Sequence, residues 1–364
     1  MKKKLRVAIL FGGKSAEHEV SLQSARNVVA ALDRDKYEPV MIGIKKTGEW
    51  LAPGISERYL ALTAKQQQTK GPEKSREIIM MAPSGSGVLT RDSGAVEGKI
   101  DVVFPILHGP FGEDGTVQGL LKLADVPFVG AGVLGSAVGM DKDVMKRLLR
   151  DAGIPIGKFL VVRSHEKLSY ADATKQLGTP LFVKPANLGS SVGVSKANTE
   201  RQFKQALLHA FQFDTKVLVE EYINGREIEC SVLGNENPIA SVPGELIVNH
   251  EFYSYEAKYT DADGMVPRIP AELSKETTKK VQETAIAAYK ALECAGMGRV
   301  DSFVTKDDRI FVNEINTIPG FTNISMYPKM WEASGLPYPK LIDRLIELAI
   351  ERHAKEKKLK TARV

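Results

Sequence analysis

Hydrophobic residues near the start of the chain form two continuous runs separated by a stretch with helical spacing. The first run is LRVAILFGG at 5–13, which enters a glycine turn, and the second is YEPVMIGI at 37–44. Between them, apolar residues recur three or four positions apart, at Val20, Ala25, Val28, Val29 and Leu32. Continuous runs are typical of buried strands and the spacing between them of an amphipathic helix, so this order predicts a parallel, doubly wound sheet.

The pattern is interrupted and then resumes. Residues 45–99 lose periodicity, with QQQTKGPEK and PSGSG segments around IIMMA, which predicts an insertion of irregular hairpins with little chemistry. A continuous run at 99–107 then predicts another buried strand, 116–124 a helix and 127–130 a short strand. We therefore expect residues 1–140 to form one α/β domain.

The residues after Met140 change in character. The segment 142–153, KDVMKRLLRDAG, predicts a helix, and an apolar strand then ends at Lys184 before a loop of glycines and serines at 189–193. Glycines let backbone amides approach an anion, while two hydroxyls and a strand-anchored lysine add donors and charge. This combination predicts a loop that covers nucleotide phosphates, with a flexible hairpin turn as the alternative.

The stretch 299–320, RVDSFVTKDDRIFVNEINTIPG, has acidic residues at positions where a buried strand would have hydrophobic ones. Its two apolar runs, joined by a charged turn, are typical of a β-hairpin. Because side chains alternate along a strand, we expect Val312, Glu314 and Asn316 to share one face, with Asp301 across from them. Carboxylate and amide oxygens are ligands that Mg²⁺ accepts beside nucleotide phosphates, so the hairpin predicts a Mg–ATP site. Charges that blunt an exposed sheet edge are the alternative interpretation.

A second acidic stretch follows the predicted strand at 216–219. Glu220 and Glu221 end that strand and Glu227 follows a short linker. A linker at the base of a nucleotide pocket would offer its backbone to adenine and Glu227 to the ribose hydroxyls. From the residues alone, solvated surface acids explain this stretch equally well.

Composition and charge narrow the class of protein. With 364 residues, 43% of them hydrophobic and 26% charged, the chain predicts a soluble protein of two or three domains. A net charge of +5, partly in the last segment RHAKEKKLKTARV, does not indicate a nucleic-acid partner. Two cysteines and the lack of a long apolar run favour neither disulfides nor a membrane. The short apolar run after MKKK is unlike a signal peptide, so we expect a cytoplasmic protein.

Two short motifs imitate nucleotide-binding signatures without their context. FGGKS at 11–15 resembles the end of a phosphate loop, but the first glycine of that loop would fall on Ala8, inside a strand. GAGVLG at 130–135 fits the dinucleotide fingerprint, yet Asp151 precedes the next apolar run instead of closing it. Neither motif therefore supports a Walker-type ATPase or a dehydrogenase.

Long motifs follow one another along the chain: GGKSAEHEVS, HGPFGEDG, MDK, LFVKPANLGSSVGVSK, YEAKY, GRVD and NEINTIPGFTNISMYP. In this series the sequence resembles the D-alanine:D-alanine ligase family of ATP-grasp enzymes. The resemblance implies an α/β fold, α+β in its ATP-clasping part, with three domains: 1–140 with the 45–99 insertion, a central lid at 141–224, and 225–364 with the metal site and a mobile loop. Pro110-Phe111 within HGPFGEDG is a small departure from the family pattern.

The resemblance implies ATP-dependent joining of two D-alanines through an acyl phosphate, for peptidoglycan precursor synthesis, by a cytoplasmic homodimer. Two alternatives remain: an ATP-grasp ligase with another amine acceptor, and a non-catalytic Mg–ATP-binding regulator. The implied nucleotide contacts are Lys142, Lys184, Gly189, Ser190, Ser191, Glu220, Glu221, the backbone of Ile223, Glu227 and Lys258. The implied ligands of two Mg²⁺ ions are Asp301, Glu314 and Asn316. Glu314 would bridge the two ions, for which Mn²⁺ could substitute, and a monovalent cation such as K⁺ could assist.

The amino-acid substrates have implied contacts at both ends. Glu17, which we expect in the first turn of a helix, would hold the ammonium of the first D-alanine near His108. The carboxylate of the second D-alanine would meet Ser325 and the backbone of Met326. The implied catalytic residues are Glu17, Ser190, Tyr259, Arg299, Gly320 and Ser325, with Arg299 and the Gly320 amide as oxyanion donors. From the residues alone, Glu17 could simply be an acid that interacts with the dipole at the start of a helix, and His108 a histidine in a turn.

Overall fold

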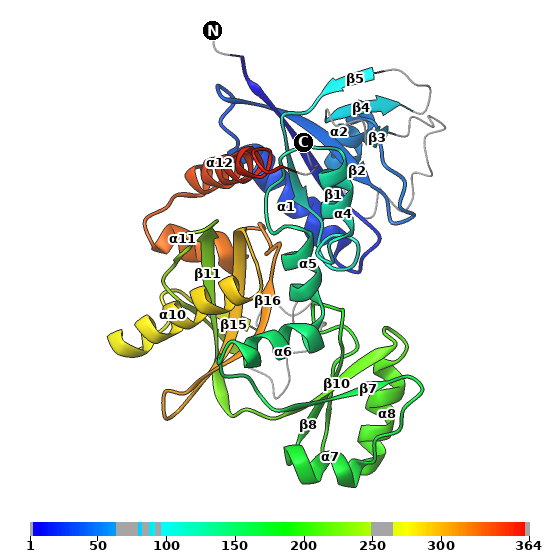
Figure 1. Ribbon diagram of the computed structural model, residues 1–364, viewed down its shortest axis with the longest axis vertical. Helices are drawn as coiled ribbons and strands as arrows, with labels where there is room; N and C mark the ends of the chain where they lie inside the picture. The colour runs from blue at the N-terminus through cyan, green and yellow to red at the C-terminus, as the bar shows by residue number, and fades with distance from the viewer. Residues whose placement is uncertain (1–2, 63–78, 82–86, 92–95, 249–264, 361–364) are drawn as a thin grey trace.

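The computed structural model describes residues 3–62, 79–81, 87–91, 96–248 and 265–360 and contains three main layers of sheet (Figure 1). The first has the parallel order β2-β1-β6. Its elements are β1 Leu5–Gly12, α1 His18–Ala31, β2 Tyr37–Ile44, β6 Val102–Ile106, α4 Thr116–Leu123 and α5 Val133–Met140. The predicted parallel sheet is therefore confirmed. The predicted strand at 127–130 is reduced to one bridge, between Val103 and Phe128.

The predicted insertion contains more order than its sequence suggests. A helix, α2, spans Pro53–Ala61 and begins with proline, whose fixed φ suits a first helical turn. A small antiparallel sheet has the order β3-β4-β5, with β3 Ile79–Met81, β4 Val88–Arg91 and β5 Val96–Lys99. Irregular hairpins were expected here, and α2 was not.

A second sheet, fully antiparallel, has the order β7-β10-β8-β9. Its strands are β7 Phe159–Arg163, β8 Leu181–Pro185, β9 Ser195–Ala197 and β10 Lys216–Glu221, preceded by helix α6 Lys142–Asp151. Helices α7 Tyr170–Leu177 and α8 Glu200–Ala210 bury Ala173, Phe203 and Ala206 against this sheet. The hydroxyls of Ser169 and Thr199 cap these helices, which explains where they begin.

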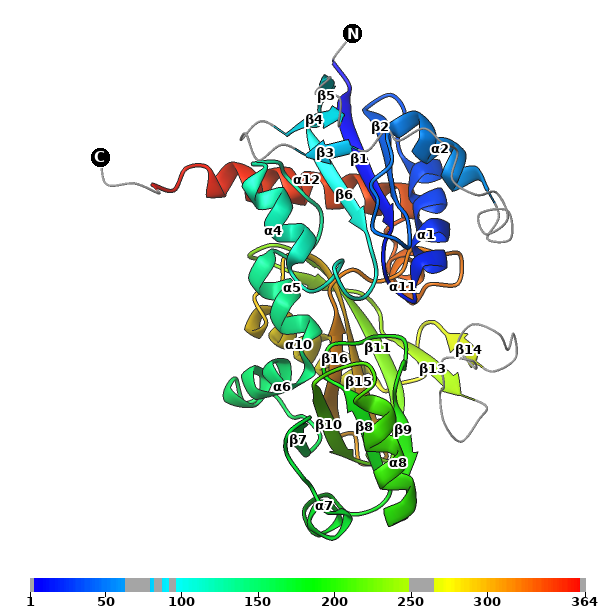
Figure 2. The ribbon, with the colours of Figure 1, turned by 90° about the vertical axis from the view of Figure 1, so that its right-hand side faces the viewer.

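The third sheet has the order β14-β13-β11-β15-β16, with β12 beside β11. Its strands are β11 Gly225–Gly234, β12 Ile239–Ala240, β13 Gly244–Val248, β14 Met265–Arg268, β15 Gly296–Thr305 and β16 Ile310–Asn316. Helix α10 Lys275–Ala291 covers one face, and α11 Met326–Ala333 and α12 Tyr338–Glu356 follow the hairpin. Figure 2 shows the second sheet next to the ends of β15 and β16.

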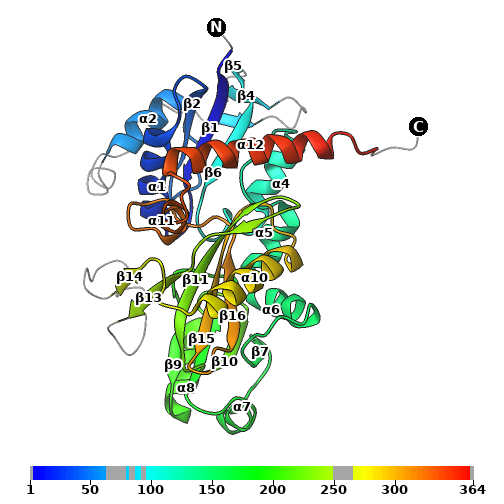
Figure 3. The ribbon, with the colours of Figure 1, turned by 90° about the vertical axis from the view of Figure 1, so that its left-hand side faces the viewer.

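The last long helix belongs to the core of the first sheet. Helix α12 buries Leu341, Leu345 and Ile346 in one hydrophobic cluster with Val7 and Ile9 of β1. Figure 3 shows α12 lying across the first sheet, far along the sequence from its strands. Among the described residues, the structure contains no helix with the length and apolar character needed to span a membrane.

The hairpin is confirmed, but one prediction about its faces is wrong. Val312 and Ile315 both lie in the core beneath α10, although residues three apart in a regular strand face opposite ways. The reason is a β-bulge: Asp301 pairs with Glu314 but Ser302 pairs with Val312, so Asn313 is an extra residue. Val312 therefore does not share a face with Glu314 and Asn316.

Candidate active site

Two buried lysines meet one carboxylate between the second sheet and α6. Glu220 of β10 places one oxygen 2.7 Å from the Lys184 ammonium and the other 3.2 Å from that of Lys146, and all three side chains are at most 10% exposed. Burial alone would raise the pKa of Glu220, but the two ammonium groups outweigh it and lower that pKa. Burial also lowers the pKa of Lys146. A site with two lysines and one acid retains positive charge for an anionic ligand.

The hairpin reaches this lysine cluster through its bulge. Lys184 donates to the side-chain oxygen of Asn313 at 3.3 Å, and the Lys142 ammonium lies 3.3 Å from Glu314. Lys142 is the first residue of α6, which begins there because the Asp141 carboxylate accepts the backbone N–H groups of the next turn. The bulge thus directs two consecutive side chains, Asn313 and Glu314, at one lysine of the second sheet and one of helix α6.

The acids of the hairpin form a second cluster beside the first. Asp301 and Glu314 pair in register, and the Asn316 amide donates to Asp301 at 2.9 Å. Arg299 donates two hydrogen bonds of 2.7 Å to Asp301, and its Nε lies 3.0 Å from Glu229. Burial would lower the pKa of Arg299, but these two carboxylates raise it well above its ordinary value. Two carboxylates and an amide on one face form an oxygen-donor set that suits Mg²⁺.

The serine loop closes against the start of α1. Ser190 and Ser191 both adopt left-handed backbone conformations, with φ of 52° and 57°. The Ser190 hydroxyl donates to Glu17, and Gly189 lies against the same carboxylate. Glu17 is the residue before α1 and not in its first turn, and its side chain does not cap the helix. The loop predicted to cover phosphates therefore also touches the carboxylate predicted to bind an amino acid.

The turn after the hairpin contacts the first sheet. His108 Nδ1 donates to the Ile318 carbonyl at 3.0 Å, and burial lowers the pKa of His108, which favours the neutral ring. The Ser325 hydroxyl accepts the Thr322 N–H at 2.9 Å and lies against Gly320, where an added Cβ would stand 2.7 Å from it. Ser325 directly precedes α11 without capping it.

The remaining predicted residues lie around the second and third sheets. Glu221 accepts the Lys158 N–H at 2.7 Å, and Ile223 packs close to Gly157. Glu227 is half-buried on β11, whereas the Met326 side chain is buried with Leu246 and Met330. Lys258 and Tyr259 lie outside the described residues.

Three residues at the site were not predicted from the sequence. Lys146 occupies a helical position that resembles a solvated one, and Asn313 is brought to the site only by the bulge. Glu113 accepts the backbone N–H groups of Gly109 and Ile318 at 2.8 and 2.9 Å. The position of Glu113 inside the HGPFGEDG motif was the one available signal.

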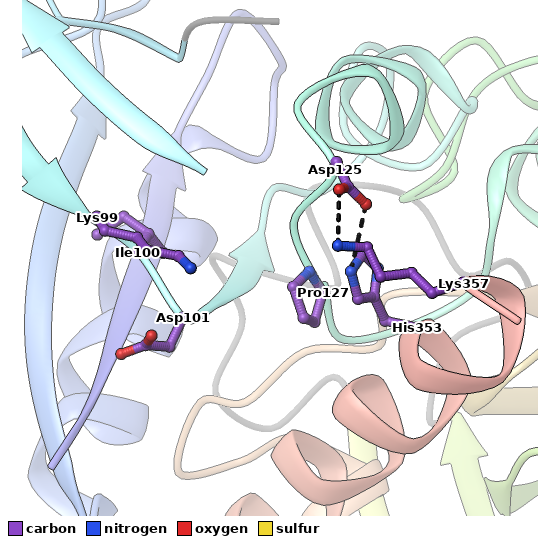
Figure 4. Close-up of a pocket in the computed structure, with 7 residues that line it drawn as sticks. All are labelled: Lys99, Ile100, Asp101, Asp125, Pro127, His353 and Lys357. Carbon is purple, nitrogen blue, oxygen red and sulfur yellow. Dashed lines mark ion pairs between the residues drawn. The ribbon is translucent and has the colours of Figure 1, made fainter. Parts of the chain in front are cut away.

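Two cavities lie outside the lysine cluster. One of about 230 Å³, mostly apolar, is lined by Gly13, Trp50, His108 and Phe111 among others, and so adjoins the predicted amino-acid site. The other, of about 200 Å³, lies at the far end of the first sheet (Figure 4). There Asp125 pairs with Lys357 at 2.8 Å and lies 3.4 Å from His353. These contacts connect the end of α12 to the loop after α4.

An antiparallel sheet and a metal-suited hairpin that meet across lysines define the nucleotide-clasping class of enzymes called ATP-grasp. Comparison with protein families gives the same result: the family models described as D-ala D-ala ligase N-terminus and C-terminus match residues 6–131 and 148–347. The chain belongs to the D-alanine–D-alanine ligase family.

Individual relatives resemble this chain over nearly its full length. A D-alanine–D-alanine ligase of Oceanobacillus iheyensis is 52% identical, covering 100% of this chain and 99% of its own. The solved structure of a D-alanine–D-alanine ligase from Coxiella burnetii is 44% identical, with a TM-score of 0.84 and 98% of each chain covered. A D-Ala:D-Ser ligase from Enterococcus faecalis is 37% identical, also with a TM-score of 0.84, over 95% of this chain and 100% of its own.

Proposed function

We propose that this chain joins two D-alanines at the expense of ATP, with phosphoryl transfer and peptide-bond formation at opposite ends of the β15–β16 hairpin. The observation that carries the proposal is the paired acids Asp301 and Glu314, placed in register beside Lys142. The product, D-alanyl-D-alanine, serves peptidoglycan precursor synthesis.

Nucleotide phosphates would lie over the lysine cluster. Lys142 and Lys184 provide positive charge, and the loop with Gly189, Ser190 and Ser191 closes from above with backbone and hydroxyl donors. Lys258 would approach the γ-phosphate. Adenine would lie near Glu220, Glu221 and the backbone of Ile223, with the ribose hydroxyls on Glu227.

Asp301, Glu314 and Asn316 would hold two Mg²⁺ ions, with Glu314 shared between them, and a monovalent cation would add to their effect. When bound, such ions would offset the negative charge of the phosphates during phosphoryl transfer. In the described structure Arg299 pairs with Asp301 and Lys142 with Glu314, so each of the two carboxylates has a positive partner.

The chain's own residues would position the two amino acids. Glu17 would bind the ammonium of the first D-alanine near His108, so that its carboxylate attacks the γ-phosphorus and gives an acyl phosphate and ADP. Ser325 and the open N-terminus of α11 at Met326 would bind the carboxylate of the second D-alanine. Tyr259 would join Glu17 and Ser190 to close the site.

The amine of the second D-alanine then attacks the acyl phosphate, forming the peptide bond and releasing phosphate. The oxyanion formed in that step needs donors already in place, each worth on the order of 3 kcal/mol. Arg299 and the Gly320 N–H would supply them. We further propose that the enzyme acts in the cytoplasm as a homodimer.

The test is formation of ADP and dipeptide from ATP and Mg²⁺ with one of four additions: D-alanine, L-alanine, D-alanine plus D-lactate, or D-alanine plus D-serine. We expect turnover with D-alanine, little with L-alanine, and D-alanyl-D-alanine as the dominant product in the mixtures. A related ligase is described as taking D-serine, so the last mixture decides the acceptor. Equal turnover with L-alanine, or none with D-alanine, would contradict the proposal.

A further inference from the structure

The backbone N–H groups of the turn after β16 differ in whether they donate a hydrogen bond. The Ile318 N–H donates to Glu113 at 2.9 Å, and the Phe321 N–H donates to the Ser24 hydroxyl at 3.1 Å. Pro319 has no N–H, and the Gly320 N–H has no acceptor among the residues that the structure describes. The turn is therefore fixed on both sides of one free donor, as an oxyanion site requires.

Glu113 is the residue that connects this turn to the loop after β6. One of its oxygens accepts the Gly109 N–H at 2.8 Å and the other accepts the Ile318 N–H. His108, from the same loop, donates to the Ile318 carbonyl at 3.0 Å. Both polar backbone groups of Ile318 are thus bound by residues of one loop, which leaves the peptide groups on either side of Ile318 little freedom to rotate.

Stability alone does not account for a carboxylate at this position. Burial, followed by the nearby charge of Glu17, raises the pKa of Glu113 to about 8. Placing a carboxylate where its charge is disfavoured lowers the stability of the fold. The position of Glu113 is therefore better explained by the geometry of its hydrogen bonds. The geometry in question is an acceptor with two oxygens, which can hold two N–H groups from segments about 200 residues apart in the chain.

We propose that Glu113 is a positioning residue for peptide-bond formation: by fixing the Ile318 peptide, it aims the Gly320 N–H at the developing oxyanion. This role rests on the proposed function of Gly320. The loop after β6 would thereby complete an oxyanion site whose donors both belong to the third sheet and the turn that follows it. Glu113 itself touches neither the substrate nor the reacting atoms.

The test compares the two chemical steps in Glu113→Ala and Glu113→Gln at saturating D-alanine. Phosphoryl transfer alone is measured by ¹⁸O exchange between the β,γ-bridging and non-bridging positions of ATP, and the complete reaction by the ratio of ADP to dipeptide. Because misplacing a reacting group by about 1 Å can cost about 100-fold, we expect a roughly 10- to 100-fold loss of dipeptide formation in Glu113→Ala. Exchange should not fall below that of the parent enzyme, because the loss concerns the later step and leaves the acyl phosphate more time to return to ATP.

The ratio of ADP to dipeptide should rise above one in Glu113→Ala, since unreacted acyl phosphate is hydrolysed by water to D-alanine and phosphate. Glu113→Gln keeps one acceptor oxygen and should lose less. Gln118→Leu is the matched control: its amide donates to the Gly112 carbonyl at 2.7 Å in the same loop and has no described contact with Ile318. We expect this control to keep the ratio at one.

Several outcomes would overturn the proposal. They are an equal loss of exchange and dipeptide in Glu113→Ala, unchanged rates in both Glu113 variants, or the same uncoupling in Gln118→Leu. If Glu113→Ala does not fold, Glu113→Gln carries the same comparison. An absence of D-alanine-dependent exchange in the parent enzyme would instead refute the proposed function, so the two failures are distinguishable.

Discussion

Replacing Glu220 by glutamine removes the one carboxylate that two buried lysines share. The side chains of Lys184, Lys146 and Glu220 are at most 10% exposed, so water cannot take over the lost charge. Removing one partner of a buried ion pair costs about 3–5 kcal/mol, because the other charge is left uncompensated. We therefore expect Glu220→Gln to destabilise the protein strongly in the absence of nucleotide.

The size of this effect sets the expected shift in melting temperature. Unfolding entropy is about 2.1 cal/mol/K per residue, so 364 residues that unfold together would melt about 4–7 °C lower. Thermal unfolding by circular dichroism, at neutral pH and without ATP, measures the shift. Glu200→Gln is the matched control, because Glu200 also lies 2.7 Å from a lysine, Lys204, but with both side chains more than 60% exposed.

We expect the control to melt within about 1 °C of the parent protein, since exposed pairs contribute about 0–1 kcal/mol. Mg–ATP should then raise the melting temperature of Glu220→Gln more than that of the parent protein, because the phosphates supply negative charge that the variant lacks. Equal melting temperatures for Glu220→Gln and Glu200→Gln would refute the reasoning. A nucleotide effect no larger than in the parent would show that the phosphates lie elsewhere.

Three further predictions concern the hairpin and its surroundings. Glu314→Ala should abolish Mg²⁺-dependent ADP formation, whereas retained turnover would mean that the hairpin acids are structural. Gly320→Ala should lower dipeptide formation at least about 10-fold, since its Cβ would meet Ser325 Oγ at 2.7 Å, and an unchanged rate would exclude a close approach there. The pKa of Glu113 is raised to about 8 in the folded state, so the folded protein binds this proton more tightly than the unfolded chain. The resulting stabilisation is complete below the unfolded pKa of about 4.5 and is lost as pH rises through 8. Between pH 5 and 8 the free energy of unfolding of the parent protein should therefore fall by roughly 2 kcal/mol more than that of Glu113→Gln, after allowance for screening of a partly exposed carboxylate. Chemical denaturation at several pH values measures this difference.

The sequence predicted those parts of the fold that depend on local pattern. The continuous apolar runs became β1, β2 and β6, and the charged turn between two apolar runs became the β15–β16 hairpin. The facing of Asp301 and Glu314 also followed from strand pairing. Each of these features is set by residues close together in sequence or by side-chain alternation, which a sequence displays directly.

Features that depend on distant contacts could not be predicted in the same way. Strand alternation gave the wrong face for Val312 because Asn313 is an extra residue, and a bulge leaves no clear periodic signal. Lys146 resembles a solvated helical position until Glu220 of β10 is placed beside it. The role of Glu113 depends on Ile318, 205 residues away along the chain.

The packing of α12 against the first sheet has a consequence for the order in which the chain folds. The cluster that joins Val7 and Ile9 to Leu341 and Ile346 cannot form until helix α12 has been synthesised. During translation, this face of the first sheet must therefore wait, covered only in part by α1, while about 230 further residues are synthesised before α12 begins. A nascent chain shorter than 338 residues would present this apolar face to chaperones, so the completed sheet depends on the last helix to be made.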